Sequence, residues 1–495
     1  MFGHRYSVTP STPATVVKGA FDTFAELMEA AAEQLDEHEA YVEPDTGRRL
    51  TFGQWFLAAD TAAAQLARDG VRAGDVVAIA LPPSIDYAVA CAAILRLGAV
   101  VTGINTRLGR RETAAILANC SPRLVIEDAS VLRRSGGRHS RPAVAAGPDD
   151  PAVIIWTSGT TGLPKGAWFD HRNLAAAIRT AGPMTQPLDR RISGVPMAHA
   201  GYMAKLWEQC AMGITLALTP TPWTAESMLD VLVTERVTVG TGVPTQWAKL
   251  LELPEAATAD LTSLRICLSA TAPAPPELVA RMRTVLGCPV VVRYAMTESP
   301  SITGTSPDDP PEVQYRTVGK PQAETTVDLV GEDGDAVPPG EVGRVRIEGP
   351  CVMRGYWRDA ATTQEVLDAQ GRLLSNDLGH FDGDGNLVLV GRASDMYIRG
   401  GYNVYPLEVE NVLTEHPSIS SAAVVGAERS VIGEIGVAFV VLVPGEPIPS
   451  PGSLRTWVAD RLADYKAPDE VRVVDALPVT AMGKIDKRAL AQACH

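Results

Sequence analysis

The sequence predicts an α/β protein with a large N-terminal domain and a small α+β C-terminal domain. The N-terminal domain would contain two helix-covered sheets and a small β-rich subdomain. Three observations lead to this prediction. Short apolar runs alternate with helical periodicity over residues 23–294, which is typical of parallel sheets covered by helices. From about residue 326, short strands are separated by Gly, Asp and Pro turns. From residue 392 a further set of strands and helices begins, long enough to fold separately.

The predicted elements follow from local periodicity. Helices have apolar residues at helical spacing, and strands are short, nearly continuous apolar runs bounded by turn residues. In the first block, helices are predicted at 23–35, 52–70, 84–97 and 173–178, and strands at 49–51, 76–81, 99–101 and 152–156. In the second block, strands are predicted at 214–218, 237–239, 265–269 and 290–292, and in the β-rich part at 326–330, 343–347 and 387–390. The last unit has predicted helices at 408–415 and 453–462 and strands at 421–425 and 437–443.

Composition excludes several classes of protein. The 495 residues are 46% hydrophobic and 21% charged, as in an ordinary globular enzyme, and the net charge of −14 argues against a nucleic-acid partner. The seven cysteines lack C-x-x-C spacing, so neither a zinc site nor a disulfide framework is indicated. The N-terminus does not resemble a secretory signal, and no apolar run is long enough for a membrane span. We therefore expect a cytoplasmic protein without a membrane span; its oligomeric state stays open.

A Gly-rich loop over residues 157–166 is the strongest local signal. It follows a predicted buried strand and contains three glycines, four hydroxyl side chains and one lysine. Glycine lets backbone N–H groups turn toward an anion, hydroxyls add donors, and lysine supplies a charge for phosphate oxygens. The spacing is not that of a Walker loop. The composition favours a polyphosphate site over a plain surface loop.

This loop resembles the phosphate-binding signature of the adenylate-forming superfamily, which includes acyl-CoA synthetases, luciferases and peptide-synthetase adenylation domains. The resemblance implies that ATP is bound through its β- and γ-phosphates. The implied phosphate-binding residues are Thr157, Ser158, Gly159, Thr160, Thr161, Gly162 and Lys165.

Three further stretches resemble signatures of the same superfamily. Residues 196–201 resemble the element whose histidine, here His199, lines or gates the acyl pocket. In residues 294–298, the resemblance implies that Tyr294 stacks on adenine, Thr297 binds the α-phosphate and Glu298 holds Mg²⁺, a metal that prefers hard oxygen ligands. Ala295 replaces the usual glycine and would narrow the pocket. The small-residue turn beside the adenine would contain Ala270, Thr271 and Ala272.

The ribose site and the pivot depart slightly from the family pattern. Asp377 matches the carboxylate that accepts both ribose hydroxyls, and Arg392 matches an arginine that contacts ribose or phosphate. Asn376 stands where the family usually has glycine, a mild change because Asn tolerates left-handed backbone angles. Ser394 occupies the pivot position, which is usually Asp or Lys.

The C-terminal part resembles the mobile lobe of CoA ligases. The resemblance divides the chain into an N-terminal domain (1–391), a hinge (392–397) and a lid domain (398–495) that rotates after adenylation. Gly400 and Gly401 would let the pantetheine arm of CoA pass close to the backbone. Residues 478–485 resemble the final signature, in which Lys484 reaches the substrate carboxylate and the α-phosphate.

These features predict an acyl-CoA synthetase that uses ATP, Mg²⁺ and CoA. Residues 195–207 contain no Asp or Glu to pair with an ammonium group, which favours an uncharged hydrophobic acid, either fatty, aryl or alicyclic. One alternative is an acyl-AMP ligase that loads the phosphopantetheine of a carrier protein, and another is a non-catalytic nucleotide-binding protein. The pocket is expected to contain His199, Gly201, Tyr202, Gly242, Val243, Thr245, Ala270, Ala295 and residues 299–301.

Overall fold

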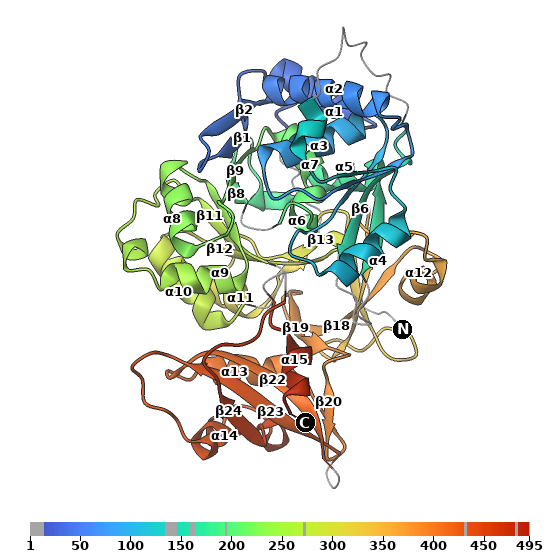
Figure 1. Ribbon diagram of the computed structural model, residues 1–495. Coiled ribbons are helices and arrows are strands. Elements are labelled where there is room, and N and C mark those ends of the chain that lie inside the picture. The colour runs from blue at the N-terminus through green and yellow to red at the C-terminus, as the bar shows by residue number, and fades with distance from the viewer. Residues whose placement is uncertain are drawn as a thin grey trace.

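The computed structural model describes residues 14–133, 146–157, 164–193, 196–270, 274–429, 433–480 and 484–494. Figure 1 shows a larger N-terminal unit, coloured from blue to light orange, above a smaller C-terminal unit in deeper orange and red. The chain passes from one to the other between β19, which ends at Arg392, and β20, which begins at Tyr397. In the described part of the chain, no helix combines the length and apolarity needed to cross a bilayer.

One sheet of the N-terminal unit has six described strands in the order β17-β7-β6-β4-β3-β5. Its centre is parallel, whereas β7 runs antiparallel to both of its neighbours. Val, Ile and Ala side chains of the central strands are buried, as expected for a sheet covered on both faces. The strands are β3 (Val76–Ile79), β4 (Val100–Gly103), β5 (Leu124–Ile126), β6 (Pro151–Thr157), β7 (Lys165–Asp170) and β17 (Gly355–Tyr356).

A second sheet has nine described strands in the order β14-β13-β12-β11-β10-β8-β9-β1-β2. The strands from β12 to β1 are parallel, and antiparallel pairs form both edges. The strands are β1 (Glu39–Glu43), β2 (Arg48–Thr51), β8 (Arg190–Ser193), β9 (Thr215–Leu218), β10 (Val239–Gly242), β11 (Ile266–Ser269), β12 (Val290–Met296), β13 (Ser299–Gly304) and β14 (Lys320–Pro321).

Two smaller sheets complete the fold. An antiparallel sheet in the order β15-β16-β18-β19 is the predicted β-rich subdomain, and it lies next to the C-terminal unit in Figure 1. Its strands are β15 (Thr326–Val330), β16 (Gly343–Glu348), β18 (Leu373–Phe381) and β19 (Leu387–Arg392). The C-terminal sheet contains β20 (Tyr397–Arg399), β21 (Tyr402–Val404), β22 (Ile419–Arg429), β23 (Gly433–Leu442) and β24 (Glu470–Val473).

The helices begin at well-formed caps. Thr23 and Thr51 each accept a hydrogen bond from the third residue of the helix that they cap, and Glu26 and Gln54 close the two capping boxes. Every residue of helix α3 (Ile85–Arg96) except Asp86 is buried, so it is a central helix and not an amphipathic surface helix. The α-helices of the N-terminal unit are α1 (Phe24–Gln34), α2 (Phe52–Arg68), α3 (Ile85–Arg96), α4 (Arg110–Cys120), α5 (His171–Arg179), α6 (Ala200–Met203), α7 (Leu206–Met212), α8 (Ala225–Thr234), α9 (Pro244–Leu251), α10 (Pro276–Leu286), α11 (Pro311–Arg316) and α12 (Ala360–Val366). Those of the C-terminal unit are α13 (Pro406–Thr414), α14 (Pro451–Ala459) and α15 (Lys487–Gln492). The short 3₁₀ helices are η1 (Ala129–Arg133), η2 (Gly182–Met184), η3 (Pro254–Ala257) and η4 (Asp464–Lys466).

The predicted fold class is confirmed, with two local differences. The Gly-rich loop was expected to lead from a strand into a helix, but β7 lies between them and pairs Lys165 with Thr157 of β6. The buried Ala167 and Phe169 make residues 165–170 a second strand of a hairpin. The strand expected at 237–239 lies further along the chain, because β10 covers Val239–Gly242; a Cβ on Gly240 would lie 2.9 Å from the ring of Trp247, so the glycine makes room for that ring.

All seven cysteines lie within the described residues. Each is buried and carries a free thiol, as the irregular spacing of these residues predicts. Cys267 and Cys288 lie next to each other, with 3.5 Å between their sulfur atoms.

Candidate active site

A hydrogen-bonded group formed by Tyr294, Asp377 and Arg392 lies where β12 meets β18 and β19. Asp377 and Arg392 are direct partners in the antiparallel pairing of β18 and β19. Tyr294 Oη donates to Asp377 Oδ2 (2.7 Å), and Arg392 Nε donates to Asp377 Oδ1 (3.1 Å). Burial and the adjacent Asp377 raise the pKa of Tyr294 well above its ordinary value, so its hydroxyl keeps the proton that it donates. Burial disfavours the charge of Arg392, but Asp377 and Asp395 raise its pKa.

Lys484 brings the C-terminal part of the chain to this group. Burial and the charge of Arg392 lower the pKa of Lys484, while the carboxylates of Asp377 and Glu298 oppose that change. Its backbone is held by Thr480, which donates to the Lys484 carbonyl (2.7 Å) and accepts from the Lys484 N–H (3.3 Å). The ammonium therefore acts among two carboxylates and a guanidinium that the N-terminal part supplies.

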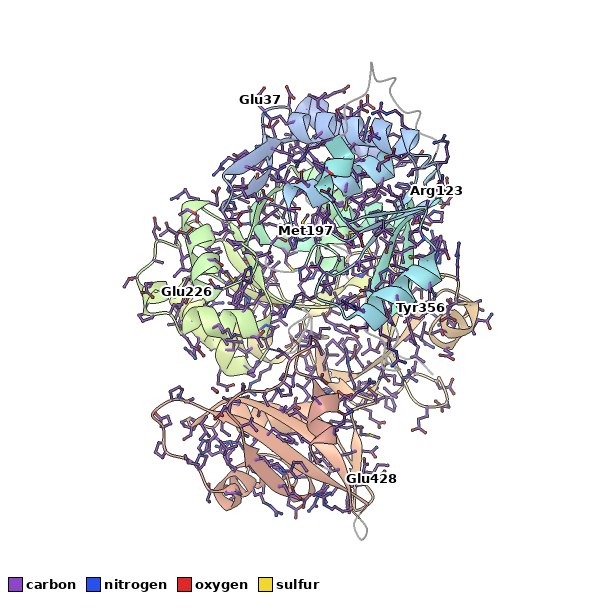
Figure 2. The ribbon with its side chains drawn as sticks, in the orientation of Figure 1. Glu37, Arg123, Met197, Glu226, Tyr356 and Glu428 are labelled. Atoms are coloured by element: carbon purple, nitrogen blue, oxygen red, sulfur yellow. The ribbon has the colours of Figure 1, made fainter. Side chains whose placement is uncertain are left out.

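His199 approaches the same place from α6. It caps this helix, and its Nδ1 accepts a hydrogen bond from Gly201 N (3.2 Å). Burial, followed by the charge of Lys484, lowers the pKa of His199 to about 4. The imidazole is therefore neutral near pH 7. Met197, two residues earlier, lies in the interior of the N-terminal unit (Figure 2).

Glu298 and Thr297 occupy the turn between β12 and β13, and Tyr356 on β17 holds Glu298 in place. Tyr356 Oη donates to Glu298 Oε1 (2.7 Å), and Met353 N donates to the Glu298 carbonyl (2.8 Å). Lys165 Nζ lies 5.4 Å from the centre of the Tyr356 ring. Tyr356 thus connects the lysine of the Gly-rich loop with Glu298. Sequence reasoning did not single it out; its only signal is an aromatic pair after a glycine, which is also typical of packing.

Several predicted site residues lie apart from this group or outside the described residues. Thr157 ends β6, and Ala270 follows β11, where its N–H donates to Gly242 O (3.4 Å). Gly400 and Gly401 form the left-handed turn between β20 and β21 and belong to the C-terminal sheet, not to the group around Asp377. Ser158, Gly159, Thr160, Thr161, Gly162, Thr271 and Ala272 lie outside the described residues.

Asn376 and Ser394, two residues that depart from the family pattern, contact each other. Asn376 Nδ2 donates to Ser394 Oγ (2.8 Å), and Ser394 Oγ donates to Asp395 Oδ1 (3.0 Å). Ala393 N also donates to the Asn376 carbonyl (2.9 Å). Two hydrogen bonds to Asn376 therefore connect residues 393–394, which follow β19, to β18.

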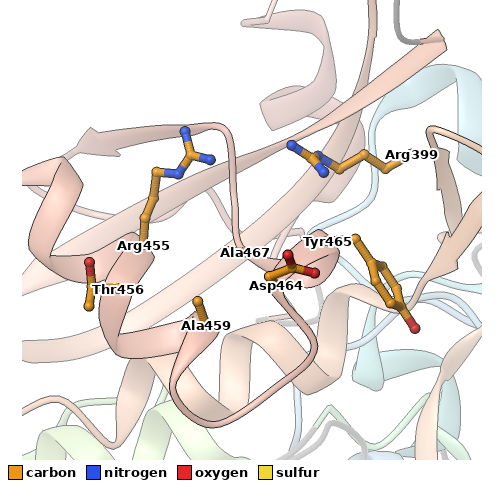
Figure 3. A pocket seen from close by; sticks show the side chains of 7 residues that line it. All are labelled: Arg399, Arg455, Thr456, Ala459, Asp464, Tyr465 and Ala467. Atoms are coloured by element: carbon orange, nitrogen blue, oxygen red, sulfur yellow. The ribbon is translucent and has the colours of Figure 1, made fainter.

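The C-terminal unit has a hollow of its own. It encloses about 370 Å³ and is lined by residues of β20, α14 and η4, including Arg399, Arg455 and Tyr465 (Figure 3). Arg399 forms a two-pronged ion pair with Asp469, at 2.8 and 2.6 Å, so its charge is already matched. Tyr465 stacks on the exposed Tyr402 with 4.5 Å between ring centres.

A family model described as AMP-binding enzyme matches residues 28–357, which is more than half of the chain. The chain belongs to the AMP-binding enzyme family. A second model, the AMP-binding enzyme C-terminal domain, matches residues 408–484. Members of this family include acid–thiol ligases, and this chain is one of them.

Individual relatives match this AMP-binding enzyme over nearly its whole length. A feruloyl-CoA synthase from Amycolatopsis sp. is 34% identical over 462 residues, covering 89% of this chain and 93% of that protein. The long-chain-fatty-acid–CoA ligase FadD13 of Mycobacterium tuberculosis is 31% identical over 481 residues, covering 91% and 94%. The structure of ATP-bound MatB from Rhodopseudomonas palustris is 27% identical, with a TM-score of 0.86 and coverage of 95% and 98%.

The residues present suit ATP and one magnesium ion. Magnesium usually takes one or two carboxylates and completes its shell with water and phosphate oxygens, so Glu298 alone is a sufficient protein ligand. Within the described ranges, no group of three or more His, Cys, Asp or Glu side chains forms a cage for a metal.

Proposed function

We propose that this enzyme is an acyl-CoA synthetase. It would couple a carboxylic acid to the α-phosphate of ATP, release pyrophosphate, and transfer the acyl group to the thiol of CoA. The observation that carries the proposal is Lys484, a C-terminal residue whose ammonium interacts with Asp377, Arg392 and Glu298 of the N-terminal unit. A cation that the C-terminal unit brings to polar groups of the N-terminal unit is suited to anionic reactants.

The charges of the reactants explain this arrangement. A carboxylate that attacks a phosphate brings two anions together, so the barrier is largely electrostatic and oriented cations lower it. Lys484 would contact the carboxylate and the α-phosphate, and Thr297 would donate a hydrogen bond to the α-phosphate. Neutral His199 can line the acid site without adding charge. A magnesium ion on Glu298 would neutralise phosphate charge when bound.

The nucleoside end would bind at the group around Asp377. Both carboxylate oxygens already accept hydrogen bonds, one from Tyr294 and one from Arg392, and each has a further lone pair for a ribose hydroxyl. Lys165 would contact the leaving pyrophosphate together with the rest of the Gly-rich loop. This arrangement favours cleavage at the α-phosphate.

For the second step we propose that residues 392–397 act as a hinge and that the domain from residue 398 rotates. Gly400 and Gly401 have positive φ angles, and apart from each glycine and its two chain neighbours no described residue has an atom within 4 Å of the place where a Cβ would stand. This hairpin turn therefore leaves room for a narrow thiol arm. The acceptor is free CoA under this proposal, in agreement with the names of the curated relatives, which are CoA synthases and ligases.

The deciding experiment mixes the full-length protein with ATP, magnesium and a panel of fatty, aryl, alicyclic and dicarboxylic acids. We expect pyrophosphate release that depends on the acid and an acyl-CoA product when CoA is present, measured by a coupled assay and mass spectrometry. Thioester formation only with a holo-carrier protein would replace CoA as the acceptor. Absence of pyrophosphate with every acid would support the non-catalytic alternative.

The contact between Asn376 and Ser394 gives a prediction about the hinge. Their hydrogen bond ties the segment after β19 to β18, and we expect it to favour the arrangement in which Lys484 faces Asp377, so Ser394→Ala should lower acid-dependent ATP–pyrophosphate exchange. A single partly exposed hydrogen bond contributes about 0.5–1.5 kcal/mol, which corresponds to roughly a 2- to 10-fold reduction. The initial rate of ATP–pyrophosphate exchange measures this reduction.

A double-mutant cycle supplies the control. Asn376→Ala should reduce exchange by a similar factor, and the double variant should be no worse than either single variant, because both remove the same bond. Additive effects would mean that the two side chains act independently and that the bond does not stabilise this arrangement.

A further inference from the structure

Tyr356 on β17 lies between two residues that are expected to handle charge in the adenylation step. Its hydroxyl donates a hydrogen bond to Glu298 Oε1 (2.7 Å), and Lys165 Nζ lies 5.4 Å from the centre of its ring. The side chain is 7% exposed and belongs to the main hydrophobic core. One buried tyrosine therefore interacts both with the carboxylate that suits magnesium and with the lysine of the Gly-rich loop.

The backbone of Tyr356 is held on two sides. On one side β17 pairs with β7, where Tyr356 lies opposite Ala167 and Trp357 N donates to the Gly166 carbonyl (2.7 Å). On the other side Tyr356 N donates to Thr363 Oγ1 (2.9 Å), which belongs to α12. These bonds fix the place from which the tyrosine side chain extends, so its hydroxyl reaches Glu298 from a defined position.

The segment that carries Tyr356 also holds the turn that carries Glu298. Met353 N donates to the Glu298 carbonyl (2.8 Å), and Tyr356 Oη donates to the Glu298 side chain. The same stretch of chain thus fixes both the backbone and the carboxylate of Glu298. A free glutamate side chain has several rotamers, so fixing it before the ligand arrives removes part of the entropy cost of binding.

This hydrogen bond leaves the carboxylate of Glu298 able to bind a metal. A tyrosine hydroxyl is neutral near pH 7, so it donates to the carboxylate without cancelling the negative charge. An ionised carboxylate has about four lone-pair sites, and the bond from Tyr356 uses one of them. A partner that orients a metal ligand in this way usually contributes about 10- to 100-fold to metal affinity.

The ring of Tyr356 gives a comparable support to Lys165. An ammonium within about 6 Å of the centre of an aromatic ring is attracted by the negative face of that ring. The ring has no net charge, so it leaves the charge of the lysine available for phosphate oxygens, which a carboxylate partner would not do. The flexible side chain of Lys165 is therefore guided without being neutralised.

We propose that Tyr356 is a positioning residue for adenylation, with two separable contributions. Its hydroxyl orients Glu298 toward the metal that accompanies ATP, and its ring orients Lys165 toward the outer phosphates. Tyr356 itself touches neither reactant under this proposal. The inference rests on the proposed acyl-CoA synthetase function for the roles of Glu298 and Lys165, and it adds a residue that acts through both of them.

Two substitutions separate these contributions, and binding without turnover measures both. The full-length protein is loaded with the α,β-methylene analogue of ATP, which cannot be cleaved at the α-phosphate, and bound Mn²⁺, a hard cation like Mg²⁺, is followed by electron paramagnetic resonance. Tyr356→Phe keeps the ring but removes the donor, and it should raise the Kd for Mn²⁺ by about 10-fold or more. Tyr356→Leu should have this effect too. It should also weaken binding of the analogue at saturating magnesium, measured by isothermal titration, by about 2- to 30-fold, the usual range for one cation–π contact.

Two double-mutant cycles show whether Tyr356 acts through these partners. In a Glu298→Gln background, Tyr356→Phe should have little further effect on Mn²⁺ binding. In a Lys165→Met background, the difference between Tyr356→Phe and Tyr356→Leu in binding of the analogue should disappear. A tyrosine that only packs would give the same losses in every background, and that result would contradict the proposal.

Tyr315→Phe is the matched control. It removes the hydroxyl of a tyrosine on α11 that packs against a separate hydrophobic cluster, so binding of Mn²⁺ and of the analogue should keep the natural values. If Tyr356→Phe unfolds at the natural temperature and binds Mn²⁺ as tightly as the natural protein, the hydroxyl does not position Glu298 and the proposal is wrong. These measurements need neither an acid nor CoA, so they decide the role of Tyr356 even if no acid supports pyrophosphate release.

Discussion

Replacing Lys484 with alanine is expected to reduce acid-dependent ATP–pyrophosphate exchange by about 10²- to 10³-fold, the usual cost of removing one donor that stabilises transition-state charge. The reason is its position. The pKa of Lys484 responds to Arg392, Asp377 and Glu298, so its ammonium acts where the carboxylate and the α-phosphate would meet. Radioactive exchange or a coupled pyrophosphate assay measures the effect.

Two controls make this result specific. Thioester formation from preformed acyl-AMP should be largely retained in Lys484→Ala, because under the proposed rotation of the C-terminal domain this lysine would leave the site before the thiol attacks. Lys487→Ala removes a nearby lysine that lies 2.6 Å from Glu410 in the C-terminal unit, and it should leave exchange close to normal. If Lys484→Ala exchanged pyrophosphate at the natural rate, the role given to Lys484 would be wrong.

The pH dependence of ATP–pyrophosphate exchange should also reflect the protonation of Lys484. Burial lowers the pKa of Lys484 below the ordinary lysine value, and only the protonated amine can neutralise phosphate charge. Exchange should therefore decline on the alkaline side at a lower pH than an exposed lysine would impose. On the acid side, the low pKa of His199, about 4, keeps the imidazole neutral, so it should not limit the rate near neutrality.

The fold could be predicted from local pattern because most of its elements are continuous apolar runs or clear amphipathic helices. The prediction was wrong at the start of β7, where a Gly-rich loop and a lysine conceal the second strand of a hairpin that pairing with β6 stabilises. Similarly, Gly240 in β10 weakens the strand signal, while the reason for the glycine is the indole of Trp247, which only the folded chain brings close.

The sequence predicts the residues of the candidate site that lie within short motifs, but not the contacts between motifs. Asp377 and Tyr294 each lie in a motif, but their hydrogen bond joins residues 83 positions apart, so no local pattern contains it. Tyr356 and Glu298 are 58 positions apart, and a tyrosine alone carries no chemical signal.

Asp377→Ala is the second large expected effect, a rise of about 10²-fold in the KM for ATP. The carboxylate accepts hydrogen bonds from Tyr294 and Arg392 and is predicted to bind the ribose. Hydrogen bonds to a charged group contribute about 1.5–3 kcal/mol each, so the loss of the two predicted bonds to ribose, each at the lower end of that range, gives this magnitude. Initial-rate kinetics with varied ATP measure it.

The loss of Asp377 should also change the pKa of Lys484. This second effect distinguishes Asp377 from a residue that only binds the nucleotide. Asp377 raises the pKa of both Arg392 and Lys484, so without it the alkaline decline of exchange should move to lower pH. Asp377→Asn keeps the shape and one acceptor oxygen and should raise the KM less than alanine does. Asp384→Asn, in the exposed turn between β18 and β19, is the matched control and should leave both KM and pH profile unaltered. An unaltered KM for ATP in a folded Asp377→Ala variant would show that the ribose binds elsewhere.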